Sequence, residues 1–352
     1  MSTVAAPAPS GWLKSRWFDV NFIGLIAAVA IIVGVTAYLF PQSAEPIFFM
    51  NVWFLGYHHV IATYTRLVFD KSSAKEYIHL LTTIPAIVLI FTAGLGFTVG
   101  VAALITVFFH WQWFHYTRQS WGIACAYRRQ AAKQPMHHPK IAEIVFWSVP
   151  IFGLIHRSWQ GWDAYWSVPM MMLPVGDIVY YAFMAYAGAA ICYWIWSMVH
   201  DLKHKQFAKF YHAYLASHFA IFFISYYVIP DLSMGWLVVN IWHNAQYIAF
   251  VWLYNQRKFK DGVDPKAKFL STISQPQNVW LYFTVCMVIT TLIYGTFKLI
   301  TVRLAPGTEV LAMLILYQTI NYHHYIADSM IWKTRKKKAV ASGKAARPYN
   351  ID

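Results

Sequence analysis

Histidines recur inside the most apolar stretches of this 352-residue chain. Ionisable side chains are costly in such stretches, so each one is a hypothesis for a functional site. The histidines fall in five separate segments, GYHHVIATYTR, FFHWQWFHYTRQ, YHAYLASH, NIWHNAQY and NYHHYIAD. Imidazole is a ligand for zinc, copper, iron and nickel. The pattern therefore predicts a buried metal centre, whose predicted ligands are His58, His59, His110, His115, His218, His243, His323, His324 and Asp328.

The distance of these histidines from basic residues places them at similar depths. His59 lies seven residues before Arg66, and His324 lies nine residues before Lys333. With the rise of an α-helix, such spacings put the imidazoles roughly 10–14 Å inside the boundary that the basic residues mark, and His243 at about 20 Å. Helix bundles build internal metal sites in this way, with ligands that project inward from facing helices.

Polar side chains accompany the histidines at helical spacing. Asp328 is the one carboxylate clearly inside an apolar segment, and a carboxylate one turn from a histidine can bind the same metal or hold the ring N–H of the ligand. Asp328 and Tyr317 are therefore the predicted catalytic side chains, and no residue is assigned to an organic cofactor. Three helical faces carry such groups: Tyr317, Asn321, His324 and Asp328; His59, Thr63 and Arg66; and Asn240, His243, Gln246 and Tyr247.

A structural role is the alternative for some of the histidines. A histidine in a membrane helix can be a neutral partner in an interhelical hydrogen bond, and we expect this of His212. Two adjacent histidines point about 100° apart on a helix, so one of each HH doublet can be structural. Six others lie at segment ends or in a connection and are expected at the interface: His79, His137, His138, His156, His200 and His204.

The elements that must position these residues are membrane-spanning helices. The chain is 59% hydrophobic and 12% charged, and soluble domains carry about twice that charged fraction. Ten stretches approach the length of about 20 residues that crosses the hydrocarbon core, although the fifth is short and could be re-entrant. They cover residues 20–40, 47–69, 78–97, 99–121, 142–157, 176–199, 208–229, 234–255, 278–300 and 309–331.

The predicted fold is an all-α, polytopic transmembrane helix bundle. Residues 1–19 form an N-terminal segment, residues 20–331 the transmembrane domain and residues 332–352 a basic tail. Lys and Arg gather in every second connection, from Lys14 and Arg16 to the KTRKKK run at 333–338, which predicts that both termini are cytoplasmic. The expected location is a bacterial inner (plasma) membrane.

The same distribution of charge excludes other classes of protein. The net charge of +14 marks topology and gives no reason to expect a nucleic-acid partner. The cysteines, Cys125, Cys192 and Cys286, form no CxxC and predict neither a disulfide framework nor a thiolate metal site.

An all-histidine site with one carboxylate favours non-haem iron, followed by zinc and then copper. Iron in this setting activates O₂, and a site inside the membrane favours an apolar substrate that arrives from lipid. We therefore expect an oxygenase that attacks a lipid, terpenoid or carotenoid chain and is supplied by an electron-donor protein. Trp111, Trp113, Phe114 and Trp242 could wall the pocket, and ordinary helix packing explains them equally well.

In the number of histidines and in their predicted cytosolic side, the chain resembles membrane-bound alkane hydroxylases and fatty-acid desaturases, which hold a di-iron centre there. Their HxxxH and HxxHH boxes are missing, because residues 110–115 form HWQWFH and the HH doublets lack an upstream histidine. The chain also resembles bacteriorhodopsin-related β-carotene dioxygenases, which are polytopic and hold iron with intramembrane histidines. Both resemblances imply an integral membrane non-haem iron oxygenase, with one or two irons.

Three other classes of function compete with this hypothesis. A haem protein would use paired axial histidines, such as His59 with His110 or His218 with His243. A transporter of metal or protons would use the histidines and Asp328 as a path, and would be expected to show helices broken by Gly or Pro and internal repeats. A structural subunit of a larger membrane complex would need no metal.

Overall fold

The computed structural model describes residues 11–332, and this part of the chain is nearly all-α. The predicted tail at 333–352 lies outside the described residues. The sequence predicted one domain over residues 20–331, whereas contacts group its helices into two units. Unit 1 takes the chain up to Asn51 together with Ile105–Gln246, and unit 2 takes Val52–Leu104 and the chain from Tyr247 onward.

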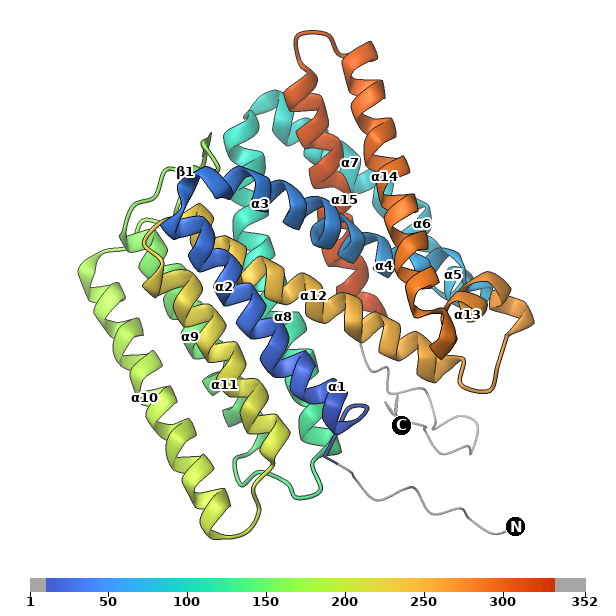
Figure 1. Cartoon of the computed structure of the whole chain (residues 1–352). Coiled ribbons are helices and arrows are strands. Elements are labelled where there is room, and N and C mark those ends of the chain that lie inside the picture. The colour runs from blue at the N-terminus through green and yellow to red at the C-terminus, as the bar shows by residue number, and fades with distance from the viewer. Residues whose placement is uncertain (1–10, 333–352) are drawn as a thin grey trace. The chain divides into compact units, whose positions relative to one another are not determined.

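Unit 1 is built mainly from long helices. Its N-terminal part contains α1 (Arg16–Val20), the π-helix η1 (Asn21–Leu25), α2 (Ile26–Leu39), the 3₁₀-helix η2 (Pro41–Ser43) and α3 (Ala44–Met50). Its second part contains most of α8 (Val101–Gln130), then α9 (Pro139–Trp159), the short β1 (Ala164–Tyr165) and β2 (Val168–Pro169), α10 (Asp177–Lys203), α11 (Lys209–Phe223), the π-helix η4 (Ile224–Val228) and the first part of α12 (Leu232–Lys258). The two strands pair antiparallel, and α9 packs against both α10 and α11 (Figure 1).

Unit 2 contains most of the π-helix η3 (Asn51–Tyr57), then α4 (His58–Val68), α5 (Lys71–Glu76), α6 (Ile78–Leu81) and α7 (Thr83–Thr98). After the last part of α12 come the 3₁₀-helix η5 (Pro265–Ala267), α13 (Lys268–Ile273), the 3₁₀-helix η6 (Pro276–Asn278), α14 (Val279–Leu304) and α15 (Glu309–Ile331). The helix α15 packs against α7, α14 and α4. Gly96 allows the close approach of α7, because a Cβ there would lie 2.9 Å from Cγ1 of Ile315 on α15.

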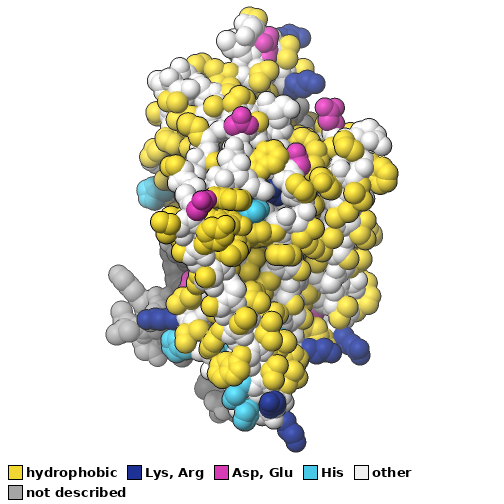
Figure 2. Space-filling model, turned by 90° about the vertical axis from the view of Figure 1, so that its left-hand side faces the viewer, with side chains coloured by type: hydrophobic (Ala, Val, Ile, Leu, Met, Phe, Trp, Pro, Cys, Tyr) yellow, Lys and Arg dark blue, Asp and Glu magenta, His cyan; other side chains and the backbone are white. Residues whose placement is uncertain are grey.

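Four helical segments of the described chain are long and apolar enough to cross a membrane: Arg16–Leu39, Pro139–Trp159, Asp177–Lys203 and Pro276–Leu304. Their exposed side chains include large apolar ones, such as Ile178 on α10 at 87% and Trp280 on α14 at 80% exposed. Figure 2 shows one face on which hydrophobic side chains predominate, with Lys and Arg toward its ends. Large exposed apolar surfaces mark sites of contact with a membrane or a partner, so these helices are consistent with a helical membrane protein.

Each of the ten predicted stretches overlaps a helix in the structure. The fifth, expected to be short, is the continuous 21-residue helix α9, with Pro150 inside it. The second stretch runs through α3, η3 and α4, and the third is divided between α6 and α7 at Thr82. The crossing of a membrane by the remaining segments, and the cytoplasmic placement of both termini, stay predictions.

Candidate metal centre

The helix α4 carries the first half of the site. It begins at His58, directly after the π-helical segment η3, and π-helical turns inside helices are frequent at functional sites. His59, Thr63 and Arg66 follow at the spacing that places side chains on one face of a helix. All three are buried, with exposed fractions of 4% or less. In an apolar helix such a polar face must find its partners inside the protein.

The helix α15 carries the second half of the site. His324 and Asp328 are four residues apart, so they lie on the same face one turn from each other. The His324 ring is fully buried and Asp328 nearly so. The distance from His324 Nε2 to Asp328 Oδ2 is 3.7 Å. Contacts between α4 and α15 within unit 2 bring the two faces together.

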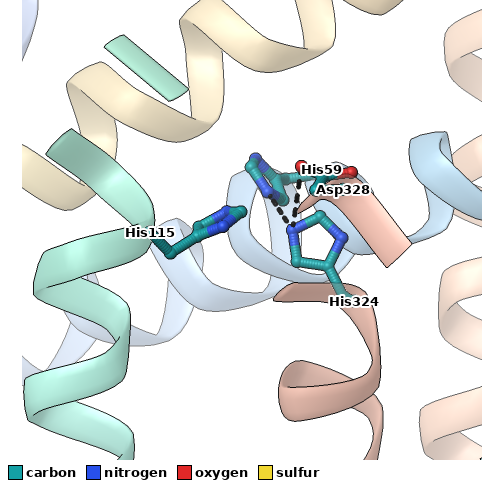
Figure 3. Close-up of side chains that lie close together, drawn as sticks. All are labelled: His59, His115, His324 and Asp328. Carbon is teal, nitrogen blue, oxygen red and sulfur yellow. Dashed lines mark hydrogen bonds and ion pairs between the residues drawn. The ribbon is translucent and has the colours of Figure 1, made fainter. Parts of the chain in front are cut away.

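His59, His324 and Asp328 each offer one ligand atom, and these atoms lie within 4.8 Å of one another. The Nε2 atoms of the two histidines are 2.7 Å apart, and Figure 3 shows the two rings and the carboxylate converging. Two imidazole nitrogens form a hydrogen bond only if one of them carries a hydrogen. A metal ion that binds both nitrogens would displace that hydrogen from Nε2, and a neutral imidazole can carry it on Nδ1 instead.

Thr63 joins the ligand candidates from α4. Its Oγ1 lies 3.0 Å from Nδ1 of His324, 3.2 Å from Oδ1 of Asp328 and 2.5 Å from the hydroxyl of Tyr247. Tyr247 in turn donates to Asp328 Oδ1 at 2.6 Å. If His324 Nδ1 donates its hydrogen to Thr63, its Nε2 presents a lone pair toward His59. Contacts of this kind fix the tautomer and orientation of metal ligands.

The donor set suits a transition metal. Two histidines and one carboxylate are the protein ligands of the non-haem iron(II) oxygenases that leave coordination positions open. Zinc accepts the same ligand types. His59, His324 and Asp328 thus form a group inside unit 2 that could hold a metal ion, and their role as ligands stays a prediction.

Not every predicted ligand in unit 2 joins this group. His323, the neighbour of His324, has protein partners at both ring nitrogens, Nε2 with the Leu80 carbonyl at 2.7 Å and Nδ1 with the Tyr64 hydroxyl at 2.6 Å. His58 is buried edge-on against Phe283. One member of each doublet, His59 or His324, thus lies in the cluster, and the other, His58 or His323, lies outside it.

Tyr317, predicted to be catalytic, lies in an aromatic group in unit 2. Its ring is 5.5 Å from Tyr57 and 6.2 Å from Tyr294, and the rings of Tyr57 and Tyr294 stack at 3.7 Å. The hydroxyl of Tyr317 therefore stays a candidate on the sequence argument alone.

His115 and His243 form a second pair, within unit 1. His115 (also labelled in Figure 3) lies on α8 and His243 on α12, and their buried rings are 5.0 Å apart in an edge-to-face arrangement. Tyr116 packs 4.1 Å from the ring of His243. Both histidines stay predicted ligands.

Other histidines of unit 1 are held by the protein. His218 contacts Ser120 through Nδ1 at 3.0 Å and the Phe146 carbonyl through Nε2 at 3.2 Å, so both nitrogens are engaged. His212 lies 3.3 Å from Oδ2 of the buried Asp201, a structural partner of the kind expected for it. His110 is half-buried, and its Nδ1 contacts the carbonyl of Thr106.

Two buried groups of unit 1 differ from the sequence expectation. His137 is only 4% exposed, because its Nε2 contacts the hydroxyl of Tyr211 in the core. Burial, assisted by the charge of Arg128, lowers the pKa of His137 to about 4. Arg157, predicted to lie in a connection, is fully buried and donates to the carbonyls of Ser225, Ile229 and Pro230. No spacing in the sequence signals the partners of Arg157, since they lie 68 to 73 residues away from it.

No model of a known protein family matches the chain, and no curated protein or solved structure is significantly similar to it.

Proposed function

We propose that this chain is an integral membrane metalloprotein that holds iron through His59, His324 and Asp328. We further propose that it is a non-haem iron oxygenase that acts on an apolar lipid, terpenoid or carotenoid, with electrons from a donor protein. The observation that carries the proposal is the convergence of two imidazoles and one carboxylate at buried positions of unit 2. Bound iron would supply the activation of O₂.

The surroundings of the three side chains support metal binding over a purely structural role. Thr63 contacts Nδ1 of His324, and Tyr247 donates to Oδ1 of Asp328. Outer contacts of a metal site order its ligands in this way. A buried cluster of this kind without a metal would hold a carboxylate in an apolar interior. Exposed apolar side chains on α14 of the same unit, such as Trp280 and Leu292, support the choice of a substrate that arrives from lipid.

The haem hypothesis gains no support from these distances. Axial histidines bind from opposite sides of the iron at about 2 Å each, so their nitrogens must be about 4 Å apart with the porphyrin between them. His59 and His324 form a direct contact of 2.7 Å. His218, which was paired with His243 as a suggested axial ligand, has a protein partner at both nitrogens.

Metal analysis and an optical spectrum of the protein purified in detergent test the proposal. We expect stoichiometric iron without the Soret band of haem. His324→Ala and Asp328→Asn should abolish the bound iron, because each removes a ligand. His79→Ala is a matched control, since His79 is exposed on α6 of the same unit.

Two results would contradict the proposal: wild-type protein that binds no metal even after incubation with Fe(II), or variants that retain it. A Soret band would favour haem. The same measurement on His115→Ala and His243→Ala decides whether the pair in unit 1 contributes to metal binding.

A further inference from the structure

Tyr247 contacts this cluster through both its ring and its hydroxyl, and it is not among the proposed ligands. It is fully buried on α12, with its ring 4.2 Å from the ring of His59. Its hydroxyl donates to Asp328 Oδ1 at 2.6 Å and lies 2.5 Å from Thr63 Oγ1. The phenol is therefore in contact with one proposed ligand and hydrogen-bonded to another.

We propose that Tyr247 is the redox-active side chain of this centre, an inference that rests on the proposed function. In this step the O–H bond of Tyr247 breaks. The electron passes to the metal ion that O₂ has oxidised, which is reduced by one electron, and the proton passes to Oδ1 of Asp328. A neutral phenoxyl radical remains on Tyr247. The short hydrogen bond supplies the acceptor for the proton, so no charge is left uncompensated in the buried site.

The other neighbours of Tyr247 confine the radical. The indole N–H of Trp332 donates to the Tyr247 hydroxyl at 3.2 Å, which makes Trp332 the next oxidisable group. The guanidinium of Arg66 lies 4.3 Å from the centre of the Trp332 ring and 4.2 Å from that of Tyr254. A positive charge over an aromatic face stabilises the neutral ring and so disfavours a cation radical on either one. The oxidising equivalent is thereby kept on Tyr247, beside the metal.

The role of Tyr247 is tested by electron paramagnetic resonance. Protein loaded with Fe(II) under anaerobic conditions is mixed with O₂ in the absence of substrate and frozen. We expect an organic radical whose hyperfine pattern changes when the protein carries ring-deuterated tyrosine. In Tyr247→Phe, loaded with Fe(II) until its iron content matches that of the wild type, the radical should be absent. Tyr282→Phe is the control, because Tyr282 is buried in the same unit and its hydroxyl contacts Thr65 at 3.4 Å.

The outcomes separate this inference from the proposed function. Protein that binds no iron overturns both. Wild-type protein that binds iron without forming a radical overturns the inference alone. So does a radical that survives in Tyr247→Phe, or one insensitive to labelled tyrosine. The labelling measurement uses the wild-type chain, so it does not depend on the folding of a variant.

Discussion

The hydroxyl of Thr63 offers a sharp test of how the ligands are oriented. Thr63→Val keeps the size and branching of the side chain and removes only the oxygen that contacts His324, Asp328 and Tyr247. Without it, the Nδ1 hydrogen of His324 has lost its acceptor, and the tautomer that aims Nε2 at the metal is no longer favoured.

The expected loss follows from these three contacts. Removal of an outer contact of a metal ligand reduces metal affinity about 10- to 100-fold, which corresponds to about 1.4–2.8 kcal/mol. The same change leaves buried polar groups without a partner, and each such group costs about 1–3 kcal/mol of folding stability. Because Thr63 serves three partners that also contact one another, the effects should not add, and we expect a loss of stability toward the lower end of this range.

Competition with a chromophoric chelator measures the affinity in detergent. The matched control is Thr65→Val on the same helix, since Thr65 is equally buried but bonds to the Ala62 carbonyl. It should lose stability without losing metal affinity. Wild-type affinity in Thr63→Val, or an equal loss in both variants, would refute the assignment of Thr63 as the residue that orients His324.

Two further predictions concern stability. Although burial alone would raise it, the pKa of Asp70 is held below its ordinary value of 3.8 by hydrogen bonds from Lys258 and other groups. The stabilisation is therefore present above pH 3.8 and lost as the pH falls below it, so acid should reduce the unfolding temperature less in Asp70→Asn than in the wild type. Gly235→Ala should lower the unfolding temperature by several degrees, because its Cβ would lie 2.1 Å from the Ser225 carbonyl oxygen. Gly188→Ala, with no atom within 4 Å of the new Cβ, should not; equal unfolding temperatures in the two glycine variants would contradict the packing argument.

The helices could be predicted from the sequence because long apolar segments in lipid must satisfy their own backbone hydrogen bonds. Three features could not be predicted from the sequence: the division of the helices into two units, the π-helical segments, and the break between α6 and α7 at Thr82. These features depend on contacts between residues far apart in the chain. Arg157 shows where prediction from the sequence fails. Its basic side chain indicated a connection outside the membrane, whereas carbonyls at the end of η4 and beyond hold it in the interior.

The candidate site was predictable to the level of helical faces. Spacing alone placed His324 with Asp328 and His59 with Thr63, because residues four apart share a face. It could not tell which member of each HH doublet would meet the other helix, since that depends on how each helix is rotated about its axis. The carbonyl of Leu80, which holds His323, has no signature in the sequence.

The division between apolar and polar helices has a consequence for the biogenesis of the protein. Segments such as α10 and α14 can partition into the bilayer one at a time as they leave the ribosome. By contrast, α15 carries Asp328 near its C-terminal end, where an aspartate opposes insertion by less than the cost of about 2.5–3.5 kcal/mol that it has at the centre of a spanning segment. The helix α15 is synthesised after α4 and α12, so Thr63 and Tyr247 are already in the chain to receive that carboxylate. We therefore expect the earlier helices of unit 2 to assist the integration of α15, because they supply the partners of its buried carboxylate.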